Sequence, residues 1–192
     1  MLIVLFGYLA GSIPFAFLLA RRVGVDVRFA GSGNVGAANV FRTAGATRGA
    51  LVLVLDIGKG ALAVALASLT NASVPLTAAT GAAAVIGHVY PVWLRFRGGK
   101  GVAVAAGVFA VLAPLATLAA AGVFLICLSL TRYVSLGSVA ATLALPPAAW
   151  LTGAPTAVVV TTGLAAALIV FRHRTNIQRL RAGTERRIGV PA

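Results

Sequence analysis

The sequence has little negative charge and almost no cysteine. Of its 192 residues only 10% are charged, three are acidic and one is a cysteine, whereas 60% are hydrophobic. A single cysteine, Cys127, excludes an intrachain disulfide and a metal site built from paired cysteines. Water-soluble domains carry about 25% charged residues. The shortage of polar side chains therefore predicts an integral membrane protein.

The net charge of +13 raises the question of a nucleic-acid partner. The basic residues do not gather in one soluble segment, however; they lie between the apolar runs. In a membrane protein this distribution reports the orientation of the chain, because cytoplasmic loops carry an excess of lysine and arginine. We therefore expect a lipid bilayer as the partner, and no nucleic acid.

Long apolar runs predict an all-α, polytopic fold. A helix needs about 20 apolar residues to cross a bilayer. The candidate crossings lie in five segments: Leu2–Ala20, Ala50–Val74, Pro75–Leu94, Val102–Thr131 and Tyr133–Phe171. The last two are too long for one crossing each, and we expect them to turn near Pro114 and at Thr152–Pro155. The sequence thus predicts seven transmembrane helices in one membrane-embedded domain, residues 1–192.

The distribution of basic residues favours seven crossings over six. With seven, all 16 lysines and arginines fall on one face, whereas a single long helix through Pro114 splits them nine against seven. Because basic residues accumulate on the cytoplasmic face, we expect an external N-terminus and a cytoplasmic C-terminus. The expected location is the cell membrane.

A polar stretch, GSGNVGAANVFR at Gly31–Arg42, separates the first two apolar runs. Glycines allow a ligand to approach the backbone closely, and Ser, Asn and Arg side chains can hydrogen-bond phosphate oxygens. A flexible connector is the alternative. The candidate phosphate-binding residues are Gly31, Ser32, Asn34, Gly36, Asn39 and Arg42.

A second glycine-rich turn, FRGGKG at Phe96–Gly101, opens the fourth predicted helix. Such a turn can present backbone N–H groups and the positive end of a helix dipole to an anion. It lacks the hydroxyl residue of a nucleotide P-loop. A basic turn with a purely topological role is the alternative. The candidate anion-binding residues are Gly98, Gly99, Lys100 and Gly101.

The polar tail at 173–185, HRTNIQRLRAGTE, follows the last apolar run. Its arginines could simply bind anionic lipid headgroups. It also holds Glu185, one of only three acids, and His173, one of two histidines. Arg132 and Ser135 add a basic and a hydroxyl residue to the same predicted face.

Three ionisable residues lie within the apolar segments. Asp56 and Lys59 are three positions apart and so share one face of a helix. Ionisable groups inside a bilayer are costly and often functional, although a structural ion pair is an alternative. His88 lies near the predicted cytoplasmic end of the third helix, where it either serves catalysis or supplies a packing hydrogen bond.

Taken together, GSGNVGAANVFR, LDIGKG, GHVYPVWLRFRGGKGVA and HRTNIQRLRAGTE resemble the bacterial acyl-phosphate:glycerol-3-phosphate acyltransferase family. The resemblance covers nearly the whole chain in order. It implies transfer of a fatty acyl group from acyl phosphate to the 1-hydroxyl of sn-glycerol 3-phosphate, which gives lysophosphatidic acid and inorganic phosphate and begins phospholipid synthesis. One departure is visible, because Ala38 stands where the family usually has threonine.

The resemblance also implies roles for the candidate residues. Ser32, Asn34, Asn39 and Arg42 would hold phosphate or the developing oxyanion, and Lys100 with the N–H groups of Gly98–Gly101 would stabilise the leaving phosphate. Asn176, Arg179 and Glu185 would close the pocket from the tail, with His173 nearby, and Asp56 would orient Lys59. The proton acceptor stays open between His88 and an oxygen of the donor phosphate.

The absence of another family's catalytic motif is consistent with this chemistry. No aspartate stands five positions after either histidine, where Trp93 and Gln178 occur, so the His-x4-Asp base of other glycerolipid acyltransferases is absent. No cofactor or metal is expected, because an acyl phosphate is already activated and positioning can supply much of the rate. The competing hypothesis is a small transporter or channel for phosphate-bearing solutes.

Overall fold

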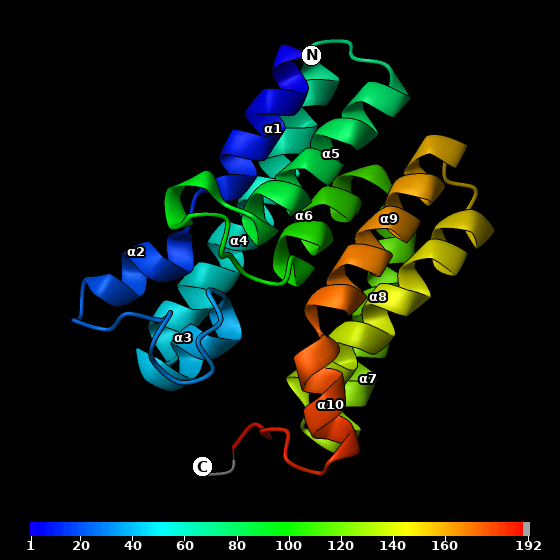
Figure 1. The fold of residues 1–192 in the computed structure, drawn as a ribbon. Helices are drawn as coiled ribbons and strands as arrows, with labels where there is room; N and C mark the ends of the chain where they lie inside the picture. The colour runs from blue at the N-terminus through cyan, green and yellow to red at the C-terminus, as the bar shows by residue number, and fades with distance from the viewer. Residues whose placement is uncertain (190–192) are drawn as a thin grey trace. The chain divides into compact units, whose positions relative to one another are not determined.

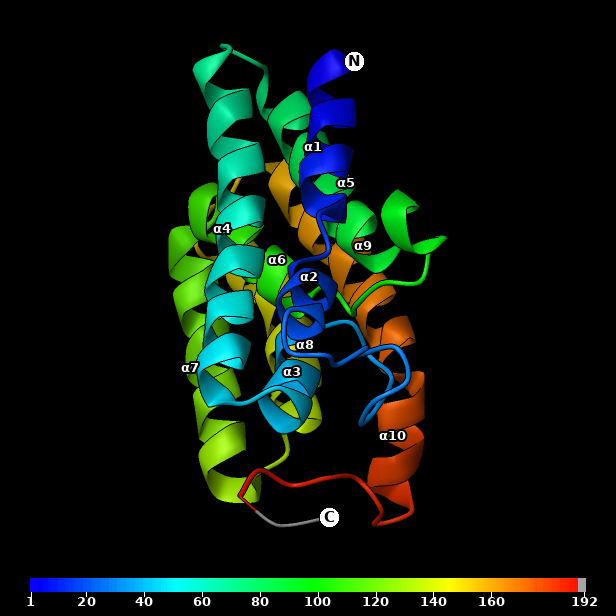
Figure 2. The ribbon, with the colours of Figure 1, turned by 90° about the vertical axis from the view of Figure 1, so that its left-hand side faces the viewer.

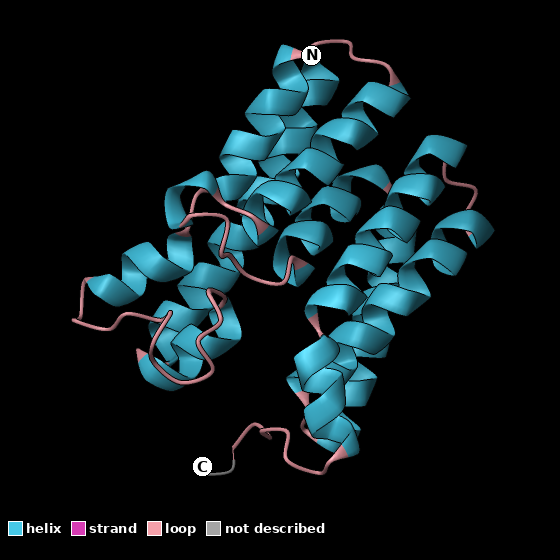
Figure 3. Ribbon diagram, viewed as in Figure 1, coloured by secondary structure: helices cyan, strands magenta, loops and turns pink. Residues whose placement is uncertain are grey.

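The structure, a computed structural model, describes residues 1–189, and in that part the chain is helical with no strand (Figure 3). It separates into two compact units, Met1–Val111 and a second that begins at Leu112. The helices of the first unit are α1 (Leu2–Ser12), α2 (Phe15–Arg21), α3 (Ala37–Thr43), α4 (Ala46–Leu69), α5 (Val74–Val89), a 3-10 turn (Val92–Leu94) and α6 (Val102–Leu112). The second unit contains α7 (Pro114–Thr131), α8 (Val134–Leu151), α9 (Thr156–Arg172) and α10 (Arg174–Arg181) (Figure 1).

Several of these helices are suited to a bilayer. Four helical stretches in the described chain are long and apolar enough to cross one: Leu2–Arg21, Ala46–Leu69, Pro114–Thr131 and Val134–Leu151. A fifth would be the pair α9 and α10, which bends by 57° at their junction, and α6 is shorter. The prediction of an all-helical protein with several apolar helices is confirmed, and the count of seven crossings stays a prediction.

Two predicted turns are present where proline and glycine place them. The chain breaks between α6 and α7, and α7 begins at Pro114, where proline is tolerated because the first helical N–H groups have no partner within the helix. The second break lies between Leu151 and Thr156. The pair Pro146–Pro147, by contrast, lies inside α8 without ending it.

The first apolar run differs from the prediction of one continuous helix. It divides into α1 and α2 at Ile13 and Pro14. Proline has no N–H to continue the ladder, and it disfavours the helical conformation of the residue before it. Ile13 accordingly has an extended ψ of 117°. This break matters because it opens beside the candidate site.

Glycines allow the helices of the first unit to pack closely. α1 and α5 lie side by side in both views (Figures 1 and 2), and their contact is made at Gly7, Gly11 and Gly87. A Cβ at any of these would overlap the backbone of the other helix. Gly60 of α4 and Gly107 of α6 form a similar contact. Small residues at helix contacts are typical of membrane bundles.

A buried apolar cluster supports the first polar stretch. Its members come from α2, α3, α4, the 3-10 turn and the connecting loops: Ala16, Ala20, Val27, Val35, Val40, Ala44, Val52 and Leu94. The cluster includes Val35 from the middle of the polar stretch and Leu94 from just before the second glycine-rich turn. It therefore anchors both candidate phosphate loops on one core.

Candidate active site

An ion pair lies in the interior of the first unit. Nζ of Lys59 is 2.8 Å from Oδ1 of Asp56, one turn earlier on α4, as their spacing predicts. Asp56 is 1% and Lys59 5% exposed. A buried charge without a partner is costly, so each side chain makes the other's burial tolerable.

Lys59 also contacts two groups outside its own helix. Its Nζ donates to the backbone carbonyl of Ile13 at 2.8 Å and lies 3.1 Å from Nδ1 of His88 on α5. The ring of Phe15 lies 5.5 Å from the ammonium. One cation thus joins α4, the break in the first apolar run and the end of α5.

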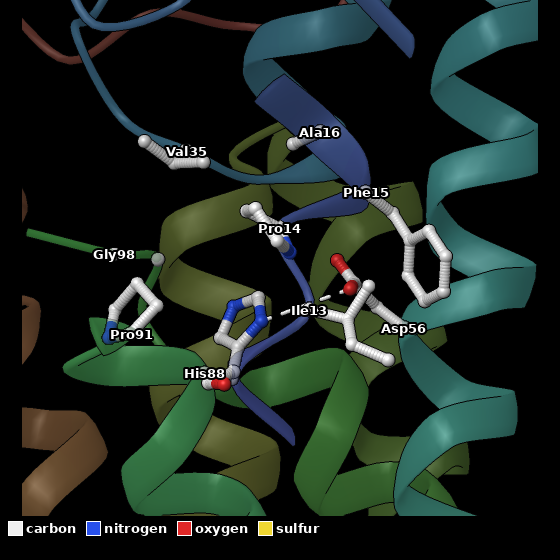
Figure 4. A pocket seen from close by; sticks show the side chains of 11 residues that line it. Ile13, Pro14, Phe15, Ala16, Val35, Asp56, His88, Pro91 and Gly98 are labelled. Atoms are coloured by element: carbon white, nitrogen blue, oxygen red, sulfur yellow. Dashed lines mark ion pairs between the residues drawn. The ribbon is translucent and has the colours of Figure 1, made fainter. Parts of the chain in front are cut away.

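A small pocket adjoins this ion pair (Figure 4). The close-up shows His88 and Asp56 facing each other across it, with Nδ1 of His88 3.7 Å from Oδ1 of Asp56, longer than a hydrogen bond. Apolar side chains and the second glycine-rich turn complete its wall. The lining residues are Ser12, Ile13, Pro14, Phe15, Ala16, Val35, Asp56, His88, Pro91, Gly98 and Gly99.

The second glycine-rich turn folds back on the end of α5. The N–H of Gly98 donates to the carbonyl of Val89, and that of Gly99 to the carbonyl of His88, both at 3.1 Å. Two N–H groups that the sequence assigned to the leaving phosphate are therefore used within the fold, because the C-terminal carbonyls of α5 need donors. Lys100 is half-buried at the end of this turn, and Gly101, with φ of +92°, leads into α6.

The two candidate phosphate loops meet at Gly99. A Cβ on Gly99 would overlap Nε2 of His88 and approach the carbonyl oxygen of Val35 to 2.7 Å. Val35 belongs to the first polar stretch and Gly99 to the second. The fold thus brings together two segments that lie more than sixty residues apart in the chain.

The first polar stretch is a loop only in its first half, since Ala37–Thr43 forms α3. Asn39, on α3, is 1% exposed and turned inward. Its Oδ1 accepts from the N–H of Ser32 at 2.9 Å, and its Nδ2 donates to the carbonyls of Val27 and Ala30. The amide of Asn39 is therefore used to shape the loop, and its phosphate contact stays a prediction.

Other residues of this stretch are accessible. Gly31 and Ser32 are exposed, Asn34 and Gly36 are half-buried, and Arg42 is exposed in the last turn of α3. Gly31 has φ of +62°, and a Cβ there would contact Oδ1 of Asn39. Asn39 thus holds the loop so that Ser32 stands at its surface.

In the second unit, Glu185 organises the tail. Its Oε1 accepts from Nδ2 of Asn176 at 2.6 Å and its Oε2 from Nε of Arg179 at 2.7 Å. Burial raises the pKa of Glu185, but Asn176, Ser135 and Arg179 outweigh it and hold the pKa below its usual range. The Ser135 hydroxyl helps to lower this pKa, although it makes no hydrogen bond of ordinary geometry to the carboxylate. The carboxylate is therefore ionised at neutral pH.

The tail also returns to the start of α8. The N–H of Ile188 donates to the carbonyl of Arg132 at 2.9 Å, and Arg187 lies over the ring of Tyr133 at 5.0 Å. His173, at the junction of α9 and α10, is 3% exposed, and its Nδ1 is 2.8 Å from the carbonyl of Ile169. The structure thus gathers the predicted residues Arg132, Ser135, Asn176, Arg179 and Glu185 in one cluster.

Sequence reasoning missed two contributors to these sites, the backbone carbonyls of Ile13 and Val35. Pro14 was the one signal in the sequence that pointed to the carbonyl of Ile13. Sequence reasoning also missed an exposed ion pair between Asp26 and Arg28, 2.6 Å apart, before the first polar stretch. Hydrogen bonds from Arg28 lower the pKa of Asp26 to about 2.

Comparisons with known proteins agree on one family. A family model described as glycerol-3-phosphate acyltransferase matches residues 1–183. The glycerol-3-phosphate acyltransferase of Myxococcus xanthus is 51% identical over 187 residues, 96% of this chain and 97% of the relative. That of Geotalea daltonii is 48% identical over 183 residues, 95% and 94% of the two chains.

Solved structures are similar over the same length. A crystal structure of PlsY, an integral membrane glycerol 3-phosphate acyltransferase, in its glycerol 3-phosphate form matches with a TM-score of 0.94 and 42% identity over 98% of this chain and 94% of that one. The lysophosphatidic acid form of PlsY matches with a TM-score of 0.92 at the same identity and coverage. The family expected from the sequence motifs is therefore confirmed: the chain belongs to the glycerol-3-phosphate acyltransferase family.

Proposed function

We propose that this protein transfers a fatty acyl group from acyl phosphate to the 1-hydroxyl of sn-glycerol 3-phosphate. The hydroxyl oxygen attacks the acyl carbon, the bond from that carbon to the phosphate oxygen breaks, and the hydroxyl proton is released. The products are lysophosphatidic acid and inorganic phosphate, and the reaction begins phospholipid synthesis. Membership of the family supports the proposal, as do the two forms in which the similar structure was solved, with acceptor and with product.

The meeting of the two glycine-rich loops at Gly99 carries the proposal. Acceptor and donor each bear a phosphate, so the reaction needs two anion-binding elements close to each other. The first polar stretch presents Ser32 from its loop and Arg42 from α3, and the second glycine-rich turn presents Lys100 before the N-terminus of α6. Arg42 can form paired hydrogen bonds to phosphate oxygens, and the start of α6 adds a favourable dipole to the charge of Lys100.

The hydrogen bonds within the two glycine-rich segments support a division of the proposed roles. Ser32, Asn34 and Arg42 bind phosphate or the developing oxyanion, and Gly31, Gly36 and Asn39 shape the loop that carries them. Lys100, with Gly101 and the first turn of α6, stabilises the leaving phosphate. In the second unit, the cluster of Arg132, Ser135, Asn176, Arg179 and Glu185, with His173, contributes to substrate binding. We propose residues 1–192 as one acyltransferase domain.

We further propose seven crossings, with the N-terminus outside and the active site on the cytoplasmic face of the cell membrane. The one-sided placement of all 16 basic residues supports this count. Reporter fusions test it: one after Ala192 reads cytoplasmic and one at the Asn71–Pro75 turn reads external. Both reporters on the same side would contradict the topology.

Donor choice tests the proposed chemistry. Cys127 is the single cysteine of the chain, and a His-x4-Asp base is absent, so the protein lacks the groups that thioester-dependent acyltransferases use. We expect turnover with acyl phosphate and little with acyl-CoA or acyl carrier protein. Cys127→Ala is the matched control and should keep wild-type rates. Comparable rates with a thioester donor would contradict the proposal.

A further inference from the structure

The buried contact between Lys59 and His88 restricts where the imidazole can carry its proton. Nζ of Lys59 has three neighbours: the Asp56 carboxylate at 2.8 Å, the Ile13 carbonyl at 2.8 Å and Nδ1 of His88 at 3.1 Å. The first two can only accept hydrogen bonds. An ammonium group has three protons to donate and no lone pair with which to accept. When Lys59 is charged, the Asp56 carboxylate is therefore its ion-pair partner, and the Ile13 carbonyl and Nδ1 of His88 are its hydrogen-bond acceptors.

Two alternatives for His88 conflict with this geometry. A doubly protonated imidazolium would place an Nδ1–H directly against an ammonium that also only donates. A neutral ring with its proton on Nδ1 would need an uncharged Lys59, which would leave the Asp56 carboxylate buried without its cation. Both arrangements cost more than the neutral ring whose single proton is on Nε2.

The Nε2 edge of His88 faces the second glycine-rich turn. A Cβ on Gly99 would overlap this nitrogen, so the ring edge lies directly against the Gly98–Gly99 turn. The backbone carbonyl of the same histidine accepts the N–H of Gly99. His88 thus contacts the turn through both its side chain and its backbone.

We propose that Lys59 locks His88 in the neutral Nε2–H form and that His88 is a positioning residue for the Gly98–Gly99 turn. In this form Nε2 already carries a proton and Nδ1 is occupied by Lys59, so the ring cannot take the proton of the acceptor hydroxyl. That proton goes instead to an oxygen of the donor phosphate and leaves with inorganic phosphate. The catalytic meaning of this assignment depends on the proposed function, but the protonation state does not.

The chain offers a direct spectroscopic test, because it has only two histidines. Full-length protein without a polyhistidine tag is labelled with ¹⁵N-histidine, purified in detergent and measured near pH 8, well above the ordinary histidine pKa of about 6.5. His173 is an internal reference with the opposite tautomer, because its Nδ1 faces a carbonyl and must donate. His173→Gln removes its signals and assigns the remaining pair.

The expected spectrum shows His88 with a protonated Nε2 and an unprotonated Nδ1. Lys59→Met should allow His88 to exchange between the two neutral forms. An Nδ1–H ring or an imidazolium in the wild-type protein would overturn the proposal whether or not the protein transfers acyl groups. If the spectrum is as expected but the protein does not transfer acyl groups, the result would instead contradict the proposed function alone.

Kinetics then separate positioning from base catalysis. Removal of a general base lowers kcat by about 10²–10⁴-fold. His88→Gln can place an amide N–H near the position of Nε2 without supplying a base, so its kcat should stay within about tenfold of wild type, the effect of one hydrogen bond. His88→Ala should raise the KM for acyl phosphate more than His88→Gln does. A folded His88→Gln protein whose kcat falls by about 10²-fold or more, as on removal of a general base, would overturn the assignment.

Discussion

The ammonium group of Lys59 donates to the backbone carbonyl of Ile13 across 46 residues of chain. Pro14 makes this contact possible, because it interrupts the first apolar helix, so that the carbonyl of Ile13 accepts from the N–H of Phe15 and from Lys59 and does not continue the helical ladder. The same ammonium contacts Asp56 and His88. One buried cation therefore connects α4, the break between α1 and α2, and the end of α5.

The first prediction concerns this buried ion pair. Lys59→Met leaves Asp56 as an uncompensated buried charge and should destabilise the protein by about 3–5 kcal/mol. The double variant Asp56→Leu/Lys59→Met removes both charges and should be more stable than Lys59→Met alone. Thermal unfolding in detergent compares them. A double variant less stable than the single one would contradict a paired arrangement.

The second prediction concerns the contact between the two loops. Gly99→Ala forces a Cβ into His88 and Val35, so the turn must shift. Activity should then fall by more than tenfold, because a rise of about 1.4 kcal/mol in the activation free energy already lowers the rate tenfold. Gly58→Ala is the matched control in the same unit, because a Cβ there meets nothing within 4 Å. Acyl transfer is measured for both. Equal activities of the two variants would show that the close contact at Gly99 is not needed for acyl transfer.

The third prediction separates the two anion-binding elements. Loss of a charge-assisted contact at a transferring group costs about 2.7–4 kcal/mol, or about 10²–10³-fold in rate. Arg42→Ala should mainly raise the KM for glycerol 3-phosphate, and Lys100→Ala should mainly lower kcat. Arg42→Lys should be impaired because lysine cannot form the paired contact, whereas Lys100→Arg keeps its charge and some activity. Wild-type kinetics in both alanine variants would rule out the loops as phosphate sites.

The fourth prediction concerns the pH dependence of stability. Because the folded-state pKa of Glu185 lies below its ordinary value of 4.5, its carboxylate stabilises the fold above that pH. The contribution is lost as the pH falls from 4.5 through the folded-state pKa. Glu185→Gln should therefore lower the unfolding temperature at neutral pH, and the gap to wild type should narrow in acid. Asp26→Asn, which breaks an exposed ion pair, is the control with a smaller effect. A gap that is constant with pH would contradict the assigned ionisation.

Local features of this fold could be predicted from the sequence. The apolar runs gave the helices, proline and glycine gave the breaks at Pro114 and at 152–155, and the i, i+3 spacing gave the pair Asp56–Lys59. These features depend on residues near one another in the chain. The motifs likewise identified the family, because they carry its chemistry in order.

Contacts between distant segments were not predictable in the same way. An asparagine in a glycine-rich loop has the same local pattern whether its amide faces a ligand or, as in Asn39, its own loop. The N–H groups of Gly98 and Gly99 turned out to serve α5, and the meeting of Val35 with Gly99 involves backbone atoms that no side-chain pattern reports. Such contacts are decided by tertiary packing.

The most direct test of the proposed reaction is whether inorganic phosphate and lysophosphatidic acid form together. Purified protein is incubated with acyl phosphate, with and without sn-glycerol 3-phosphate, and inorganic phosphate and lysophosphatidic acid are both measured. We expect equal amounts of the two products, formed only when glycerol 3-phosphate is present, and a strong reduction of both in Lys100→Ala. Phosphate release that is independent of glycerol 3-phosphate, or that occurs without lysophosphatidic acid, would contradict it.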